Sequence, residues 1–193
     1  MKRLKELVVS SRGGFTLVEL LIVVIILAVL AAIVIPQFSS STDEAKEAAL
    51  RSTLLEMRKA IELYYHQHNG TYPAFNNTTG TAASATDAEA QAALLNQLTL
   101  FSDVNGKTAV AKDLTATPPI KYGPYIKGSL IPANPVDDSS TVTIVISGAT
   151  LGQLDQPGAP AAGSAGWWYD VVSGKLVANT PGNGTDGTAY YQW

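Results

Sequence analysis

The chain has 193 residues and a formal net charge of −3, a length that suits one apolar helix and one modest globular domain. It contains no cysteine, which excludes disulfide bonds, thiol catalysis and cysteine-ligated metals. Residues 15–193 hold nine basic and fifteen acidic side chains, a net charge of −6. This acidic balance argues against nucleic acid as an obligate partner.

The first fourteen residues, MKRLKELVVSSRGG, form a basic flank that ends in two glycines. Four bases stand there against one acid, Glu6. Basic residues before an apolar segment stay on the cytoplasmic side, so the flank predicts a cytoplasmic N-terminus and a body across the membrane. Gly13 and Gly14 are poor helix formers and predict an accessible peptide bond that a membrane peptidase can cut.

A run of 21 residues follows, from Phe15 to Ile35, in which only Thr16 and Glu19 are polar. A bilayer core is roughly 30 Å thick, and about 20 helical residues cross it. The run therefore predicts a membrane helix, which Pro36 closes. Cleavage after the small residues at 31–32, as in an ordinary secretory signal, is the alternative, although the apolar run is long for such a signal.

The residues at 12–21, RGGFTLVELL, resemble the class III signal of type IV pilins and type II secretion pseudopilins. The resemblance implies that a prepilin peptidase cuts between Gly14 and Phe15 and N-methylates Phe15. Glu19 takes the place of the family's assembly glutamate. Pro36 takes the place of the proline that bends the family's helix. The resemblance covers residues from about 9 to 40.

Glu19 carries a further expectation from physics. An ionisable group inside a membrane helix costs roughly 2.5 kcal/mol or more and is usually paired, although the cost is small if Glu19 reaches the interface from the helix end. In a filament of packed helices, the new α-amino group of Phe15 on a neighbouring subunit is the natural partner, and the resemblance implies the same pairing. Such a pair would set the axial register of subunits, because a buried charge is satisfied in one position only.

Residues 37–68 predict an amphipathic continuation of the same helix, which Asn69-Gly70 ends. Large apolar residues recur there at spacings of three and four on one face: Leu50, Leu54, Met57, Ile61 and Tyr64. Two opposite-charge pairs lie four residues apart, Glu47–Arg51 and Arg58–Glu62.

Two histidines, His66 and His68, are the only imidazoles of the chain. Residues two apart do not share a helix face, and no third metal ligand lies nearby in the sequence. We therefore expect solvated side chains at the helix end rather than a metal site.

Residues 69–193 predict a globular α/β head. Thr86 and Glu89 form a capping-box pattern before a short helix at 87–98. The β-branched run at 141–147 predicts a strand.

The segments at 166–172 and 175–179 flank Ser173-Gly174 and predict a hairpin. Successive strand residues face opposite sides, so only one of Trp167 and Trp168 can face the core.

Three segments of the head also resemble pseudopilins: NGTYP at 69–73, GPY with IPANP within 123–135, and WWYD with SGKLVANT within 167–180. The resemblance implies an α+β, pilin-like fold, in which a long N-terminal helix packs on a C-terminal antiparallel sheet. Its parts are a cleaved leader at 1–14, a transmembrane and filament-core helix at 15–36, the amphipathic half at 37–68 and the head. Many major pilins carry a C-terminal disulfide, so the lack of cysteine favours a pseudopilin.

Major pseudopilins bind calcium in a C-terminal loop, and Asp170 and Asp186 are the candidate ligands here. Calcium prefers six to eight oxygens and usually several carboxylates. The C-terminal segment of this chain cannot be matched residue by residue to the calcium loop of the pseudopilins, so no cofactor is predicted. Calcium bound at Asp170 and Asp186 stays open as the alternative.

The head offers no Ser/His/Asp order and no phosphate loop, so an enzyme is not expected. The resemblance implies a filament subunit, a type II secretion pseudopilin that polymerises with itself. Its other partners would be minor subunits, a prepilin peptidase, an inner-membrane platform and an assembly ATPase. Two alternatives stay open: a type IV pilus pilin for adhesion, motility or DNA uptake, and a signal-anchored extracytoplasmic binding protein.

Overall fold

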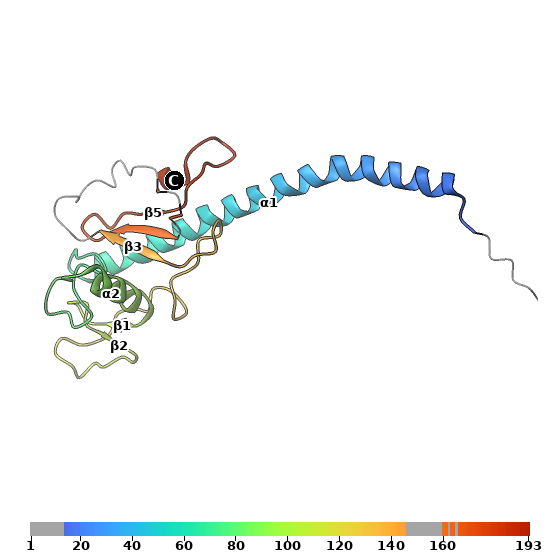
Figure 1. The fold of residues 1–193 in the computed structure, drawn as a ribbon. Coiled ribbons are helices and arrows are strands. Elements are labelled where there is room, and N and C mark those ends of the chain that lie inside the picture. The colour runs from blue at the N-terminus through green and yellow to red at the C-terminus, as the bar shows by residue number, and fades with distance from the viewer. Residues whose placement is uncertain (1–13, 146–159, 162, 165) are drawn as a thin grey trace, which may run out of the picture. The chain divides into compact units, whose positions relative to one another are not determined.

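A computed structural model describes residues 14–145, 160–161, 163–164 and 166–193, with backbone only at 34–41 and at 145. It forms two compact units, Met1–Thr42 and Asp43–Trp193. The fold is α+β, as predicted, and Figure 1 shows its elements. They are α1 (Leu17–Gln67), α2 (Asp87–Thr99), β1 (Phe101–Ser102), β2 (Thr108–Ala109), β3 (Val142–Val145), β4 (Trp167–Asp170), β5 (Leu176–Ala178) and the 3₁₀ helix η2 (Tyr190–Gln192).

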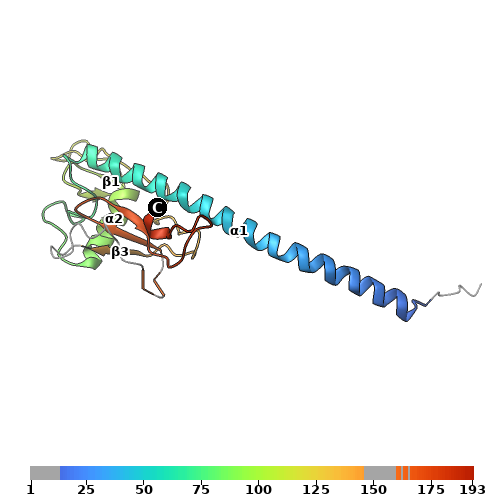
Figure 2. The ribbon, with the colours of Figure 1, turned by 90° about the horizontal axis from the view of Figure 1, so that it is seen from above.

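The part of α1 within the second unit buries one face, as its periodicity predicts. The five apolar residues of that face are at most 2% exposed: Leu50, Leu54, Met57, Ile61 and Tyr64. They share one core with α2 and with β3, β4 and β5, and these strands lie alongside this part of the helix (Figures 1 and 2). Burial of large apolar side chains stabilises the unit by roughly 1.5–3 kcal/mol each.

Helix α2 begins at the predicted cap. The Thr86 hydroxyl oxygen accepts a hydrogen bond from the Glu89 backbone N–H at 3.2 Å. The Glu89 carboxylate accepts from the Ala85 N–H at 2.8 Å, one residue earlier than in the usual capping box. The buried face of α2 includes Leu94 and Leu98 and joins the core.

The predicted hairpin forms, with β4 antiparallel to β5. Strand β3 forms within the predicted 141–147 segment, of which 146 and 147 lie outside the described residues. However, β3 pairs parallel to β4, from Val142↔Trp167 to Val145↔Asp170. The three-stranded sheet is therefore mixed rather than antiparallel, because a pattern of alternating residues does not encode strand direction. Trp167 is fully buried and Trp168 is half-buried.

Two buried amide side chains hold the irregular loops. Gln97 accepts from the Ala74 N–H at 2.7 Å and donates to the Gly106 carbonyl at 3.0 Å. Asn134, in the IPANP segment, donates to the Gly166 carbonyl at 3.0 Å and to the Thr180 hydroxyl at 2.7 Å. Both residues are 0% exposed, and buried polar groups of this kind are stabilising only when they are paired.

The C-terminal segment packs on α1 through charged side chains that the sequence assigned to other partners. Arg51 forms a 3.0 Å ion pair with Asp186 rather than with Glu47. The buried Glu47 carboxylate accepts instead from the Thr185 N–H and hydroxyl, at 2.7 and 2.9 Å. Arg58 donates to the Leu176 carbonyl at 2.8 Å, and its desolvation lowers the guanidinium pKa. Pairs of opposite charge along one exposed helix face are worth only a few tenths of a kcal/mol, so tertiary partners readily replace them.

The expectation of two solvated histidines is wrong for His68. His66 is exposed, but His68, the first residue after the end of α1 at Gln67, is only 1% exposed. Its Nδ1 lies 2.8 Å from the Tyr64 carbonyl, and its Nε2 lies 3.0 Å from the Ser102 hydroxyl. The imidazole stacks on the Tyr64 ring at 3.6 Å.

Leu54→Ala should lower the free energy of unfolding of the head by about 2–5 kcal/mol, because it leaves a cavity in the core. Urea titration followed by tryptophan fluorescence measures this loss in the detergent-solubilised full chain. The adjacent Leu55 is 55% exposed, against 2% for Leu54, so Leu55→Ala is the matched control and should change the free energy by less than about 0.5 kcal/mol. Equal losses from both variants would contradict the assigned face.

The head should lose stability as the pH falls through the ordinary histidine pKa of about 6.5. Desolvation lowers the pKa of His68 in the folded state, so the unfolded chain takes up the proton first and acidification favours unfolding. Denaturant midpoints at several pH values between 5 and 8 measure this loss. His68→Gln should flatten the pH dependence, whereas His66→Gln should leave it unchanged. A pH dependence that survives in His68→Gln would contradict the assignment.

Candidate functional site

The N-terminal end of α1 positions the residues of the predicted processing motif. The helix begins at Leu17, and Gly14 and Phe15 precede it. Phe15 is 86% exposed, and a Cβ placed on Gly14 would contact nothing within 4 Å. Within the described part of the chain, nothing therefore packs against the peptide bond between these two residues. The remainder of the predicted leader, residues 1–13, lies outside the described residues.

Thr16 and Glu19 form a reciprocal capping box at the start of α1. The Glu19 carboxylate accepts from the Thr16 N–H at 2.8 Å and from the Thr16 hydroxyl at 2.9 Å. In return, the Thr16 hydroxyl accepts from the Glu19 N–H at 3.2 Å. The T-x-x-E spacing encodes this arrangement, which satisfies donors that a helix start leaves unpaired. Both partners of Glu19 are neutral, so its negative charge stays uncompensated by these contacts.

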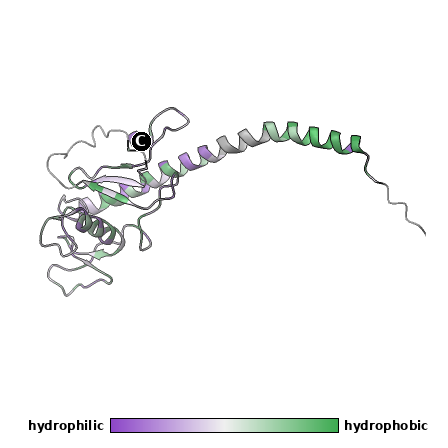
Figure 3. Cartoon of the chain, in the orientation of Figure 1, coloured by the Kyte–Doolittle hydropathy of each residue, from purple (hydrophilic) through white to green (hydrophobic). Residues whose placement is uncertain are grey.

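The following turns of α1 expose apolar side chains on every face. The large hydrophobic residues between Leu17 and Ile33 are 51–83% exposed. Figure 3 shows the same part of the helix as hydrophobic over most of its length. Within the part of the chain that the structure describes, no helix meets the length and hydropathy required of a membrane span. Exposed apolar surface of this extent marks an interaction surface.

Pro36 lies inside α1, which is assigned as helix on both sides of it. A proline at an internal helix position lacks a donor and crowds the preceding turn. The bend at Pro36 stays a prediction.

The two candidate calcium ligands of the head have other partners. The buried Asp170 accepts from the Val172 N–H at 2.9 Å and from the Ser173 hydroxyl at 2.8 Å, within the β4–β5 turn. Asp186 accepts from the Thr188 N–H and from Arg51, and these contacts hold its pKa below the ordinary value. Among the described residues, no group of three or more carboxylates or imidazoles could hold a metal ion.

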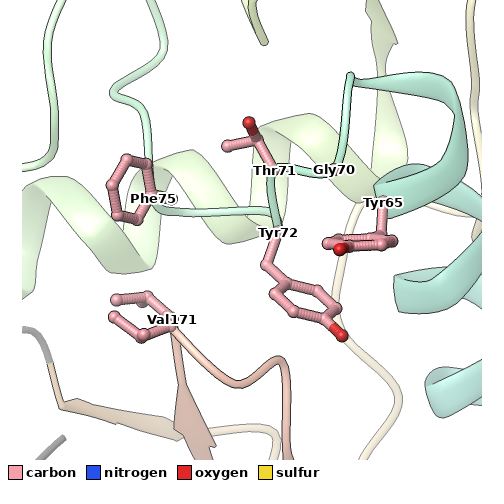
Figure 4. Close-up of a pocket in the computed structure, with 7 residues that line it drawn as sticks. Tyr65, Gly70, Thr71, Tyr72, Phe75 and Val171 are labelled. Carbon is pink, nitrogen blue, oxygen red and sulfur yellow. The ribbon is translucent and has the colours of Figure 1, made fainter.

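The head also contains a small open pocket of about 260 Å³, which the sequence did not predict. Figure 4 shows Tyr65, Tyr72, Phe75 and Val171 around it. The rings of Tyr65 and Tyr72 stack at 4.3 Å, and Gly70, Thr71 and Val172 complete the lining. We call these seven residues the aromatic pocket. The lining comes from the end of α1, from the segment that directly follows it and from the β4–β5 turn. The turn is about 100 residues further along the chain, so no local motif could have indicated the pocket.

Comparisons with known proteins identify the N-terminal part of the chain. The model of the prokaryotic N-terminal methylation motif matches residues 9–35. The curated proteins and the solved structures contain no match to this chain. The matched residues include the exposed Gly14–Phe15 bond and the Thr16–Glu19 cap. The chain thus carries at residues 9–35 the signature of the type IV pilins and pseudopilins, the proteins whose leader a prepilin peptidase removes.

Proposed function

We propose that this chain is a structural subunit of a type IV pilus-like filament, and specifically a type II secretion pseudopilin. The observation that carries the proposal is the methylation motif at residues 9–35, which coincides with an open peptide bond at the start of an apolar helix. After a cut between Gly14 and Phe15 and N-methylation of Phe15, the subunit polymerises through α1. Its function is mechanical, and catalysis has no part in it.

Before assembly, the apolar run from Phe15 to Ile35 lies in the bacterial inner membrane. The basic flank at 1–14 keeps the N-terminus in the cytoplasm and places the head on the periplasmic side. In the filament, the same apolar side chains pack against those of other copies, and removal of their surface from the surroundings provides cohesion. The partners are other copies, minor subunits, the prepilin peptidase, an inner-membrane platform and an assembly ATPase.

Glu19 pairs with the α-amino group of Phe15 on a neighbouring subunit. The hydrogen bonds from Thr16 orient the Glu19 carboxylate at the helix start without neutralising it. Enclosure among apolar helices makes an unpaired carboxylate costly, and a cation within contact distance relieves that cost. The cut at Gly14 creates such a cation, since the Phe15 nitrogen changes from a neutral amide to an amine.

A type IV pilus pilin would carry the same motif. The absence of cysteine and the three segments that resemble pseudopilins, at 69–73, 123–135 and 167–180, favour the pseudopilin. The buried Asn134 gives the second of these segments a structural role, because it joins the loop to Gly166 and Thr180.

The N-terminal peptide of the protein from its native membranes should begin at Phe15 and carry one added methyl group. Mass spectrometry of the digested protein measures both features. Gly14→Val should block the cut, because a side chain at this position enters the peptidase site in place of hydrogen, and the leader should then remain. Retention of residues 1–14 in the unmodified protein would contradict the proposal and leave a plain signal anchor.

Replacement of Glu19 should separate its charge from its role as a helix cap. Glu19→Gln keeps an oxygen that can accept from the Thr16 N–H but removes the charge, whereas Glu19→Ala removes both. We expect both variants to be cut and methylated yet to form no filaments, as counted by electron microscopy of sheared cells. Normal filaments from Glu19→Gln would show that the cap, and not the ion pair, is what assembly needs.

A further inference from the structure

The start of α1 contains an apolar groove beside the Gly14–Phe15 bond, the scissile bond of the proposed cut. The groove has a volume of about 450 Å³, and its lining residues are Phe15, Thr16, Leu17, Leu20, Leu21 and Val24. Its helical members stand at positions i, i+3, i+4 and i+7, which places them on one face of the helix. Because Phe15 belongs both to the groove and to the scissile bond, an enzyme that reaches this bond meets the groove next to it.

The groove lies on a different face of α1 from Glu19. Glu19 is two residues from both Leu17 and Leu21, and residues two apart do not share a helix face. Val23 and Ile26, at i+4 and i+7 from Glu19, lie on the Glu19 side. A neighbouring subunit that pairs with Glu19 therefore need not cover the groove. This separation, together with the scissile bond at one end of the groove, favours the processing enzyme over a second copy as the occupant.

In a membrane, the shape of this groove matters more than its hydrophobicity. On the proposed function, this part of α1 lies among lipid chains, which are as apolar as leucine side chains. Hydrophobicity alone then does not draw a membrane protein to the helix, and close packing of side chains provides the attraction. A concave surface contacts an inserted side chain on several sides, and each added contact contributes dispersion energy. The groove is thus suited to dock a side chain of a membrane enzyme.

The groove also belongs to the part of the chain that stays after the cut. Hydrolysis adds water across the scissile bond, so the leader leaves with a carboxylate at Gly14 and Phe15 keeps a free amine. In the methylation step, this amine takes a methyl group from a sulfonium donor, which becomes a neutral thioether while the nitrogen becomes a methylated ammonium. An enzyme that performs both steps loses its contacts with residues 1–14 in between. Residues from Phe15 onward must then hold the product for the second step.

We propose that the groove formed by Leu17, Leu20, Leu21 and Val24 is the surface by which the prepilin peptidase holds this chain, from before the cut until Phe15 is methylated. The inference rests on the proposed function and adds specificity-determining residues to it. These side chains act by positioning, since the scissile bond lies before the helix that carries them. Docking of the groove fixes the start of α1 in the enzyme and thereby holds the reacting nitrogen at the reacting groups.

Two matched double variants of the full chain test the groove. Leu21→Ala with Val24→Ala alters the groove, whereas Val23→Ala with Ile26→Ala alters the other face of the helix. Both pairs remove the same number of carbon atoms at the same spacing, and all of these side chains are 52–53% exposed. Each chain is supplied in lipid vesicles that contain the peptidase and a sulfonium methyl donor. Initial rates of leader removal give kcat/KM for the cut, and mass spectrometry gives the methylated share of the Phe15 ends.

The groove variant should lower kcat/KM for the cut by roughly tenfold and leave a larger share of the cut chains without the methyl group. The other variant should keep both values of the unchanged chain. Equal losses from both variants, or a normal cut of the groove variant, would overturn the docking, and complete methylation of the groove variant would overturn its role in the second step. A groove variant that is processed normally yet forms no filaments would assign the groove to a second copy instead. An unchanged chain that is never cut would contradict the proposed function itself, which is a separate result.

Discussion

The head depends on the burial of one face of α1. The strands are two to four residues long, too short to be stable as separate sheets. Strands β3, β4 and β5 gain stability because their buried residues share one core with Leu54 and Ile61 of α1. The same helix carries the exposed apolar turns at its other end. Helix α1 thus provides both the face on which the head packs and the apolar surface that we propose for assembly.

Buried polar side chains join distant segments of this head, as disulfides do in many small extracytoplasmic domains. Gln97 and Asn134 each join segments that lie apart in the sequence, and His68 joins the end of α1 to β1 through Ser102. Each is fully enclosed, so loss of one partner would leave an unpaired group at a cost of about 1–3 kcal/mol. The stability of such a head responds to protonation and to side-chain geometry rather than to the redox state of its surroundings.

Features that depend on neighbouring residues could be predicted from the sequence, whereas features that depend on distant residues could not. The buried face of α1, the cap of α2 and the β4–β5 hairpin all follow from local spacing. The parallel pairing of β3 and β4 does not, and neither does the Arg51–Asp186 pair, whose members lie 135 residues apart. The same division holds for the sites: the motif around Phe15 is continuous in sequence, but the aromatic pocket forms only when the β4–β5 turn reaches the end of α1.

The capping box gives a physical reason why processing would precede polymerisation. In the uncut chain, the nitrogen of Phe15 belongs to a neutral peptide bond, and the Glu19 carboxylate has only the neutral donors of Thr16. Packing that charge among apolar helices is then opposed by its desolvation. Cleavage after Gly14 adds a cation beside the helix start, and methylation of the amine leaves it basic. On the proposed function, the uncut subunit would therefore lack the α-amino group that pairs with Glu19, and this lack would disfavour its assembly.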